Sequence, residues 1–417
     1  MSAYGASRET TPTVDRLRER SLLFSNAFST SSWTIPAHAS MLTGRYPSSL
    51  APNPSDRRAF RAAPSLAQLF REAGYATAAF AGGGFLSKSF GVDRGFDVFE
   101  GGAGSAVLPH AVEWLEQERT APFFLFFHTY HVHIYYTDRR YVTDEQGGRL
   151  SSLFTAYPDP AFRTACCDPD FEPTADEEEF TLALYDGGVA AADEMVAEII
   201  GALERRGLME NTAIIFTSDH GEEFWEHTGK AAYHGHSLYD EILRIPFIWY
   251  EPGMQRAGQT VDAPVSLIDI VPTVAARFGL AAPADLDGVD LGALIAAGEQ
   301  LAPRPLFAEG ILHGPQRWSV RTAKGKLITT PKPDVQAGEG KKYPVPTAAP
   351  VEVYLPDDTD ERRNMATEQP GIRAELLTAL REHRAAAATE PPGSPGKPGD
   401  ELPDETTQRL RALGYVD

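Results

Sequence analysis

Cysteine is nearly absent from this chain of 417 residues. Its 2 cysteines are neighbours, Cys166 and Cys167, and adjacent cysteines rarely form a disulfide with each other. This usage excludes a disulfide framework and a zinc site of the CxxC type. Long apolar runs are lacking too. None approaches the ~18–20 residues that a membrane-spanning helix needs, so the sequence predicts no membrane span.

Positive charge is also scarce. Lysine and arginine total 38 against 58 aspartates and glutamates, which gives a formal net charge of −20. This balance argues against nucleic acid or an anionic membrane as a partner. Much of the acid lies in one run, DPDFEPTADEEE at 168–179, which we expect to be a solvated insert. The opening stretch MSAYGASRET has no hydrophobic segment of the signal-peptide type.

The rest of the composition is that of a globular protein, 42% hydrophobic and 23% charged, with length for a large domain and a smaller one. Short apolar runs of strand length alternate with amphipathic segments of helix length. The predicted strands are 76–80, 122–128, 212–219 and 246–250, and the predicted helices are 11–20, 64–74, 110–119, 178–206 and 267–278. Strands buried on both faces and separated by helices predict an α/β fold, a doubly wound and mostly parallel sheet flanked by helices.

The character of the sequence changes after about residue 315. RWSVRTAKGKLIT (317–329) predicts two strands around a Lys-Gly turn, and GIRAELLTALREHR (371–384) predicts a helix. A loop at 331–350, a linker at 390–403 and a short helix at 407–415 complete this region. We therefore expect a catalytic domain at residues 1–310 and a small α+β domain of sheet plus helix at 315–417.

The stretch SSWTIPAHAS (31–40) combines an aromatic residue, a hydroxyl, a proline and a histidine, with too few large apolar residues for a core pattern. Pro36 fits the first turn of a helix that runs to about Thr43, with Gly44 as its stop. Thr34 would then face unpaired backbone N–H groups and the positive end of the helix dipole, which suits a tetrahedral oxyanion. A threonine hydroxyl needs a base or a metal to act as a nucleophile. The alternative is that Thr34 is a helix N-cap and nothing more.

Polar residues follow two of the predicted strands. Asp219 and His220 come directly after the strand in 212–219, and His128 ends the run at 122–128. Reactive groups of α/β sheets collect at the carboxyl ends of strands, and an adjacent carboxylate and imidazole suit one divalent metal ion. Histidines are clustered near both places, at His128, His131 and His133 and again at His234 and His236. Structural or solvated histidines are the alternative.

Several long motifs in order give the chain a resemblance to a known family. TPTVDRLRERSLLFSNAFS followed by TIPAHASMLTGRYP, then NTAIIFTSDHGEEF and HGHSLYDEILRIPFI, and finally EVYLPDDTDERRN and LRALGYVD resemble the sulfatase family of the alkaline phosphatase superfamily. The resemblance covers nearly the whole chain and is strongest over residues 1–250. It implies an alkaline phosphatase-like fold and metal-dependent hydrolysis of sulfate esters.

The resemblance also implies roles for particular residues. Thr34 falls at the family's nucleophile, where the usual sulfatases have Cys or Ser in a C/S-x-P-S/A-R pattern and convert it to formylglycine. Here the pattern reads T-x-P-A-H, with His38 in place of the arginine, and threonine cannot give that aldehyde. Asp219 and His220 match metal ligands, and Thr34 would share the ion, which could be Ca, Mg, Mn or Zn.

Two further histidines match substrate-contacting positions of the family. His133 matches the histidine of the family's D-P-H-x-P-Y pattern, which reads HVHIYY at 131–136 in this chain. His236 lies where the family has a Lys or His that contacts the ester group. With Thr34 and His38, these two complete the set of catalytic residues that the resemblance implies.

The family opens with a strand ending in D-T-L-R-x-D-H, whose aspartates bind metal, and the resemblance places Met1 almost where that motif ends. We expect a start site assigned too far downstream or a shortened chain, with a natural pseudoenzyme as the alternative. Localisation is undetermined on this reading. Deleting the strand should leave neighbouring strand edges unpaired and apolar surface uncovered.

The predicted function is therefore a metal-dependent hydrolase of sulfate esters with Thr34 as nucleophile. The partner would be a small-molecule or saccharide sulfate or phosphate ester. A phosphodiester or phosphonate hydrolase, a phospho-group transferase of the same superfamily, and an inactive form or non-catalytic binding protein are the alternatives. The sequence does not indicate the organic part of the ester or the oligomeric state.

Overall fold

The computed structural model describes residues 1–51, 53, 56–57, 59–102, 104–133, 138–143, 146–153, 165, 168, 171–227, 232–330, 350–389, 406–407 and 410. Cys166 and Cys167, the linker predicted at 390–403, nearly all of the loop predicted at 331–350 and most of the helix predicted at 407–415 lie outside the described residues. Within them, no helix has both the length and the apolarity of a membrane-crossing segment.

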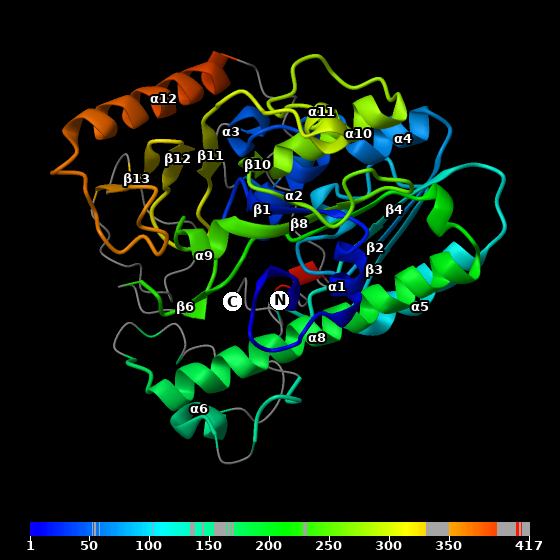
Figure 1. Ribbon diagram of the computed structural model, residues 1–417, viewed down its shortest axis with the longest axis horizontal. Helices are drawn as coiled ribbons and strands as arrows, with labels where there is room; N and C mark the ends of the chain where they lie inside the picture. The colour runs from blue at the N-terminus through cyan, green and yellow to red at the C-terminus, as the bar shows by residue number, and fades with distance from the viewer. Residues whose placement is uncertain are drawn as a thin grey trace.

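One sheet contains β1, the strand that precedes Thr34 in the chain (Figure 1). Its order is β10–β1–β8–β5, with β9 also paired to β1. β10 is parallel to β1, whereas β8 is antiparallel to both β1 and β5. The strand predicted at 246–250 therefore runs antiparallel to both of its neighbours, β1 and β5. The bounds are β1 Leu22–Phe28, β5 Ile214–Thr217, β8 Arg244–Tyr250, β9 Thr260–Val261 and β10 Val265–Ser266.

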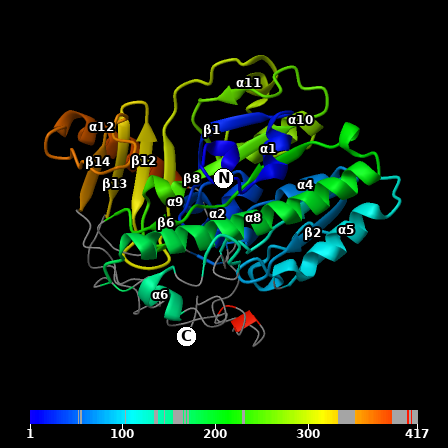
Figure 2. The same ribbon diagram turned by 60° about the horizontal axis from the view of Figure 1, so that its bottom comes forward.

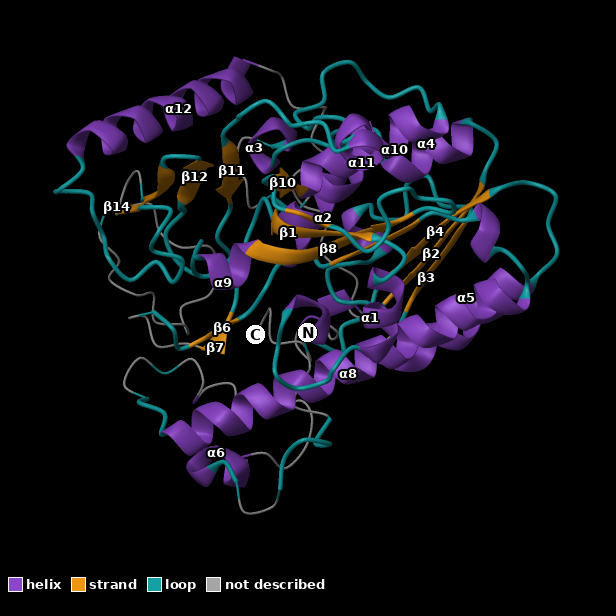
Figure 3. Cartoon of the chain, in the orientation of Figure 1, coloured by secondary structure: helices purple, strands orange, loops and turns teal. Residues whose placement is uncertain are grey.

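A second sheet is fully parallel and has the order β3–β2–β4. Its strands are β2 Ala76–Ala81, β3 Val98–Gly101 and β4 Phe123–Phe127. The strands predicted at 76–80 and 122–128 are both confirmed. The two sheets lie in one layer between helices (Figure 3), and among the described strands β4 ends one sheet and β5 ends the other.

Helices cover both faces of this layer (Figure 3). One face carries α1 Pro12–Arg18, α5 Leu108–Glu116 and α8 Ala175–Arg205; the other carries α2 Thr34–Thr43, α4 Leu66–Glu72, α10 Ile270–Phe278 and α11 Gly292–Ala297. The doubly wound α/β class predicted from the sequence is confirmed. Capping boxes at Ser65 and Thr174 fix where α4 and α8 begin.

Two of the predicted helices carry a proline in their first turn. The helix predicted at 267–278 begins as a 3₁₀ turn, Leu267–Asp269, before α10, because proline tolerates only the first turn of an α-helix and Pro272 falls there. Helix α2 begins at Thr34, so Pro36 is its third residue. Gly44 ends α2 with a φ of 71°, as predicted.

The carboxy-terminal part forms a separate antiparallel sheet of order β11–β12–β13–β14, with α12 packed on it (Figure 2). The strands are β11 Leu306–Glu309, β12 Trp318–Thr322, β13 Gly325–Thr329 and β14 Val351–Tyr354, and α12 is Pro370–Thr389. The predicted hairpin and helix are confirmed. β11 precedes residue 310, and the domain boundary at 310–315 stays a prediction.

The remaining elements are short: α3 Pro47–Leu50, α6 Gly148–Leu153, β6 Glu223–Phe224, β7 Ala232–Tyr233 and α9 Asp240–Leu243, with 3₁₀ turns at Ser2–Tyr4, Ala59–Arg61, Lys88–Phe90, Gly104–Val107 and Met209–Asn211.

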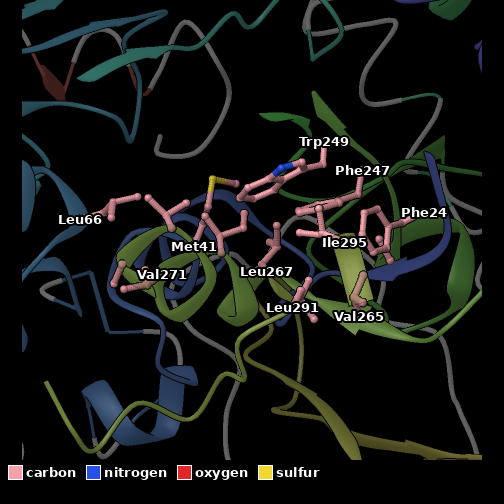
Figure 4. Packing of buried hydrophobic residues seen from close by; sticks show 14 of the residues in the cluster. Phe24, Met41, Leu66, Phe247, Trp249, Val265, Leu267, Val271, Leu291 and Ile295 are labelled. Atoms are coloured by element: carbon pink, nitrogen blue, oxygen red, sulfur yellow. The ribbon is translucent and has the colours of Figure 1, made fainter. Parts of the chain in front are cut away.

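The largest apolar core lies between the first sheet and helices α2, α10 and α11 (Figure 4). Alternation along β8 sends Phe247 and Trp249 into this core, while Ile248 packs on the opposite face against Val14. Because both faces of β8 are covered, its sequence after Arg244 contains no charged residue.

A buried ion cluster joins α9 to the small sheet. The Nζ of Lys326 lies 2.7 Å from Asp240 Oδ1 and 2.8 Å from Glu361 Oε1, and the Lys326 side chain is 2% exposed. Each carboxylate depends on this ammonium for much of its charge compensation, since a buried unpaired charge is very costly.

Lys326→Met should lower the free energy of unfolding by about 3–5 kcal/mol, because it leaves two carboxylates buried around an apolar side chain. The matched control is Lys324→Met in the adjacent turn, whose ammonium pairs with Glu375 at 2.7 Å but is 59% exposed. The control should cost less than about 1 kcal/mol. Urea denaturation of the two variants measures both values, and equal costs would show that the cluster does not stabilise the fold.

The neighbouring residue Glu241 gives the protein a pH-dependent stability. Burial, helped by the nearby carboxylates of Glu361, Glu223 and Glu226, raises the pKa of Glu241 to about 8. In the unfolded chain the pKa of a glutamate is about 4.3, so between these values the folded state holds a proton that the unfolded state has released. The contribution of Glu241 to stability is therefore present at low pH and is lost as the pH rises towards 8.

Glu241→Gln should consequently stabilise the protein at pH 8 relative to the parent chain and change little at pH 4, because glutamine mimics the protonated acid. Each pH unit by which the pKa is raised corresponds to about 1.4 kcal/mol, so the effect should reach a few kcal/mol. Denaturation at several pH values provides the measurement. Glu210→Gln, at a side chain 82% exposed, is the control, and parallel curves for all three proteins would refute the expectation.

Candidate functional site

The loop between β1 and α2 places Thr34. Trp33 is fully buried and contacts Phe85 edge-on at a centroid distance of 5.4 Å, while Ser31 donates a hydrogen bond to the carbonyl of Gly310. These contacts fix Thr34 as the first residue of α2, with no side-chain cap ahead of it. The stretch 31–40 was not expected to be core, but every residue in it is buried, because two sheets and their loops meet around it.

His38 connects this helix to the end of β5. Its Nδ1 lies 2.9 Å from the carbonyl oxygen of Thr34 and 3.2 Å from Oδ2 of Asp219. One ring nitrogen therefore contacts both the residue predicted as nucleophile and the carboxylate predicted as metal ligand. His38 is 2% exposed, so the ring is held in this position by packing.

Asp219 and His220 follow β5 in a loop held by backbone contacts. Gly221 donates its N–H to the carbonyl of Ile242 at 2.7 Å, and a Cβ at Gly221 would lie 2.1 Å from the carbonyl of Glu241, so only glycine fits. His220 Nδ1 lies 2.8 Å from the carbonyl of Gly221. Only an N–H can donate to a carbonyl, so the neutral ring has its lone pair on Nε2.

The Asp219 carboxylate stays ionised. Burial works against its charge, yet the imidazoles of His220 and His38 hold the pKa of Asp219 well below its usual range. His220 Nε2 lies 3.4 Å from Asp219 Oδ2. A nitrogen with a free lone pair and an anionic oxygen at this separation could both coordinate one cation.

Aromatic and imidazole rings from the end of β4 form the next wall. His128 contacts His38 and Tyr130 edge-on at centroid distances of 5.1 and 4.7 Å, and Tyr130 contacts His133 at 5.3 Å. Burial, followed by the proximity of His38, lowers the pKa of His128 to about 3, so this ring is neutral at pH 7. His131 is not part of the wall, since its Nδ1 lies 2.7 Å from the hydroxyl of Thr129.

The second histidine cluster is arranged differently from the prediction. His234 lies 4.3 Å from the ring of His220 and 4.9 Å from that of His133, and its Nδ1 is 2.8 Å from Glu222 Oε2. His236, the residue predicted to contact substrate, instead pairs through Nε2 with the buried Glu223 at 3.0 Å. Although burial opposes it, Glu223 raises the pKa of His236, as in a buried imidazolium–carboxylate pair.

The sequence places His234 in a cluster with His236, but it does not predict the contact of His234 with the His220 ring or its pairing with Glu222. His234 and His236 both follow the short strand β7, and their spacing of two residues does not indicate which ring faces His220. The pairing of β6 with β7 orients this segment, and a two-residue strand has too short a pattern to predict from sequence.

The residues at the strand ends share one cavity of about 1200 Å³. Its walls include Thr34, His38, His128, His133, Asp219 and His220. The structure therefore brings together every predicted site residue except His236. Within the described part of the chain, no group of three or more His, Cys, Asp or Glu side chains is arranged to hold a metal ion, so Asp219 and His220 form at most part of a metal site.

The chain resembles curated proteins over part of its length. Arylsulfatase K of Mus musculus is 29% identical over 296 residues, which make up 65% of this chain and 51% of the relative. The ulvan-active sulfatase of Formosa agariphila is 32% identical over 162 residues, or 37% of this chain and 31% of the relative. The chain thus spans about half the length, or less, of these relatives.

Solved structures share the fold over most of the chain. A 2-O GAG sulfatase superposes with a TM-score of 0.72 at 19% identity, covering 96% of this chain and 95% of its own. The phosphonate monoester hydrolase of Agrobacterium radiobacter gives a TM-score of 0.67 at 20% identity, covering 93% of each chain. The alkaline phosphatase-like architecture expected from the sequence is confirmed. The sulfatase family model matches residues 1–280, and this chain, with its ionised and imidazole side chains gathered at the strand ends, belongs to the sulfatase family.

Proposed function

We propose that this protein hydrolyses sulfate esters with Thr34 as the nucleophile. The observation that carries the proposal is the position of Thr34. It is the first residue of the ten-residue helix α2, lines the cavity and is connected through His38 to the ionised Asp219. The backbone N–H groups of the first helical turn, with the helix dipole behind them, favour the negative charge that develops on a tetrahedral sulfuryl group.

In the first chemical step, Thr34 would lose its hydroxyl proton as Oγ forms a bond to sulfur, while the bond from sulfur to the ester oxygen breaks. The leaving alcohol takes up a proton, and water then attacks the sulfated threonine to release sulfate and restore the hydroxyl. His133 lines the cavity, where its imidazole can bind sulfuryl oxygens or protonate the leaving oxygen. The ring of His234 packs behind His133 at a centroid distance of 4.9 Å and is paired with Glu222, so we propose that it positions His133.

His38 would act as a positioning residue. Its single Nδ1–H can be shared by the Thr34 carbonyl and the Asp219 carboxylate, which sets the distance between helix α2 and the end of β5. The family's arginine would carry a permanent charge at this place, whereas the histidine is a compact ring held by packing.

Sulfatases are generally dependent on a divalent metal ion, and the donors of Asp219 and His220 fit one in part. The lone pair of His220 Nε2 lies beside the carboxylate, and Thr34 Oγ would add an oxygen. The described residues offer no third carboxylate or imidazole in ligand geometry. A bound Ca, Mg, Mn or Zn ion would supply positive charge that makes the threonine hydroxyl easier to deprotonate.

The proposed substrate class is a saccharide sulfate. One relative is named as active on ulvan, and one structural neighbour is described in complex with D-glucosamine-2-N,6-O-disulfate. A cavity with both imidazole side chains and apolar walls can accept a sugar ring beside an anionic group.

A phosphate or phosphonate ester is the second candidate. Threonine rather than the formylglycine precursor stands at the nucleophile position, and the fold is shared with a phosphonate monoester hydrolase. Turnover of 4-nitrophenyl sulfate, glucosamine 6-O-sulfate, bis(4-nitrophenyl) phosphate and a phenyl phosphonate ester, compared on one preparation, separates the two. A higher kcat/KM for the phosphorus esters would replace the sulfate assignment.

Thr34→Ala should reduce turnover of the best ester by at least about a thousandfold, because removal of a nucleophile leaves only binding effects. Thr34→Ser should retain part of the activity, since it keeps the attacking oxygen. Thr43→Ala, which removes a buried hydroxyl bonded to the carbonyl of Ala39 in the same helix, is the control for packing. Activity of Thr34→Ala equal to that of the control would place the nucleophile elsewhere.

Asp219→Asn should weaken binding of Mn²⁺ by about tenfold or more, because it replaces an anionic ligand by a neutral one. The parent chain itself should hold well under one ion per molecule after dialysis, since two side chains alone bind a metal weakly. Calorimetric titration and elemental analysis give the two numbers. Stoichiometric metal in the parent chain would show that further ligands exist within it.

A further inference from the structure

Both chain neighbours of Thr34 belong to one apolar cluster, which we call the Trp33 cluster. Its buried members are Trp33, Ile35, Ala39, Leu42, Leu50, Ala59, Phe60, Ala63, Ala81, Phe85, Leu86, Phe90, Val92 and Leu410. Trp33 and Ile35 are each 0% exposed. A residue whose two neighbours are held by close packing has little freedom of position, so the packing of this cluster decides where the Thr34 hydroxyl lies.

One member of the Trp33 cluster comes from the C-terminal segment, of which Thr406, Thr407 and Leu410 are described. Leu410 is 0% exposed, whereas the other buried members of the cluster fall between residues 33 and 92. Thr406 Oγ1 lies 3.0 Å from Ser89 Oγ, at a separation of 317 residues in sequence. The C-terminal segment is therefore anchored at two points on the α/β part of the protein.

Helix α12, which precedes this segment, packs elsewhere. Its Leu376 and Leu380 belong to a different cluster, with Val320 and Leu327 of the small sheet. Figure 1 and Figure 2 both draw the C-terminal segment, in red, away from α12. The chain thus leaves the small sheet after α12 and returns to the α/β part, where Thr34 lies.

Aromatic rings connect the anchor points to Trp33. Trp33 packs edge-on against Phe85, and Phe85 contacts Phe90 edge-on at a centroid distance of 5.6 Å. Phe90 ends the 3₁₀ turn at 88–90, which also contains Ser89, the partner of the C-terminal segment. Because edge-to-face ring pairs are directional, a displacement of Phe90 or Phe85 would displace Trp33 as well.

Leu410 fills space within this set of contacts. Removing a buried leucine leaves a cavity that the surrounding side chains fill only in part, and a close-packed interior transmits the resulting strain to the groups in contact. A nucleophile tolerates little displacement, since a misplacement of ~1 Å can cost about a hundredfold in rate. Leu410 does not line the cavity of the candidate site, so its effect on the reaction would pass through Trp33 and Ile35.

We propose that the C-terminal segment is a clasp that positions Thr34, with Leu410 as the positioning residue and the hydrogen bond between Thr406 and Ser89 as the second anchor. The inference rests on the proposed role of Thr34 as nucleophile and adds the residue that holds it in place. Leu410 makes no contact with the ester; it keeps the residues on both sides of Thr34 in one arrangement.

The first test compares leucine-to-alanine substitutions in two clusters of the full chain. Leu410→Ala should lower kcat at least about tenfold and leave KM within about twofold, because attack is slowed while ester binding is kept. Leu410→Met keeps most of the volume and should recover kcat to within about threefold of the parent. The matched control is Leu376→Ala, at a side chain 1% exposed in the small-sheet cluster. Both alanine variants should melt at a lower temperature than the parent, but the control should keep kcat when assayed below its melting temperature.

Hydrogen exchange followed by mass spectrometry provides a readout that does not depend on turnover. Amides at 34–43 should exchange at least about tenfold faster in Leu410→Ala than in the parent and should be unchanged in Leu376→Ala. Thr406→Val removes the hydrogen bond to Ser89 and keeps the shape of the side chain, so it should show a smaller change of the same kind. This variant decides the matter if Leu410→Ala does not fold.

The outcomes separate the clasp from the proposed function. Equal kcat and equal exchange at 34–43 in Leu410→Ala and Leu376→Ala would show that Leu410 only fills the core, and would overturn the proposal. Faster exchange at 34–43 with kcat unchanged would overturn it too, because the nucleophile would not depend on the clasp. Faster exchange confined to Leu410→Ala, in a protein whose parent chain turns over none of the esters, would support the clasp and refute the proposed hydrolysis.

Discussion

The shared contact of His38 Nδ1 with the carbonyl of Thr34 and the carboxylate of Asp219 is the interaction on which the site depends. Thr34 belongs to a helix on one face of the sheet layer, and Asp219 belongs to the loop after a strand, so nothing in local sequence relates their positions. A buried imidazole that contacts both fixes the distance between nucleophile and carboxylate. The same ring packs edge-on against His128, which carries the constraint to the end of the second sheet. The site is therefore a junction of both sheets rather than a feature of either.

The rule that strand ends collect chemistry explains why much of this site could be predicted. Asp219, His220 and His128 follow runs whose apolar continuity identifies them as buried strands, and Thr34 opens a helix that has Pro36 in its first turn and ends at Gly44. These signals are local and strong. His234 could not be predicted in the same way, because its contact with His220 depends on the pairing of two-residue strands and on the salt bridge to Glu222. Likewise, the antiparallel direction of β8 follows from how the chain turns at α9, which hydrophobic patterning does not record.

The sheet layer is divided between β4 and β5, and the sequence and the structure give different information about these two strands. Patterning predicts strands covered on both faces at 122–128 and 212–219, and among the described residues each of these strands ends its sheet. A local propensity that disagrees with its surroundings marks a place where the described residues do not supply all the contacts that the sequence is built to make.

The protein is acidic overall, whereas the proposed substrate of its site is an anion. A formal net charge of −20 repels an anionic ester at long range, but at physiological salt such repulsion is screened beyond about 8 Å. Within that distance the ester would meet the amino end of α2 and the ring of His133, while the imidazoles of His220 and His38 stabilise the charge of Asp219. Recognition of an anion by this acidic chain must therefore be short-ranged and geometric. The neutral state of His128 strengthens that conclusion, because the donors that remain are helix N–H groups and imidazoles whose positions are fixed by packing rather than by a broad positive potential.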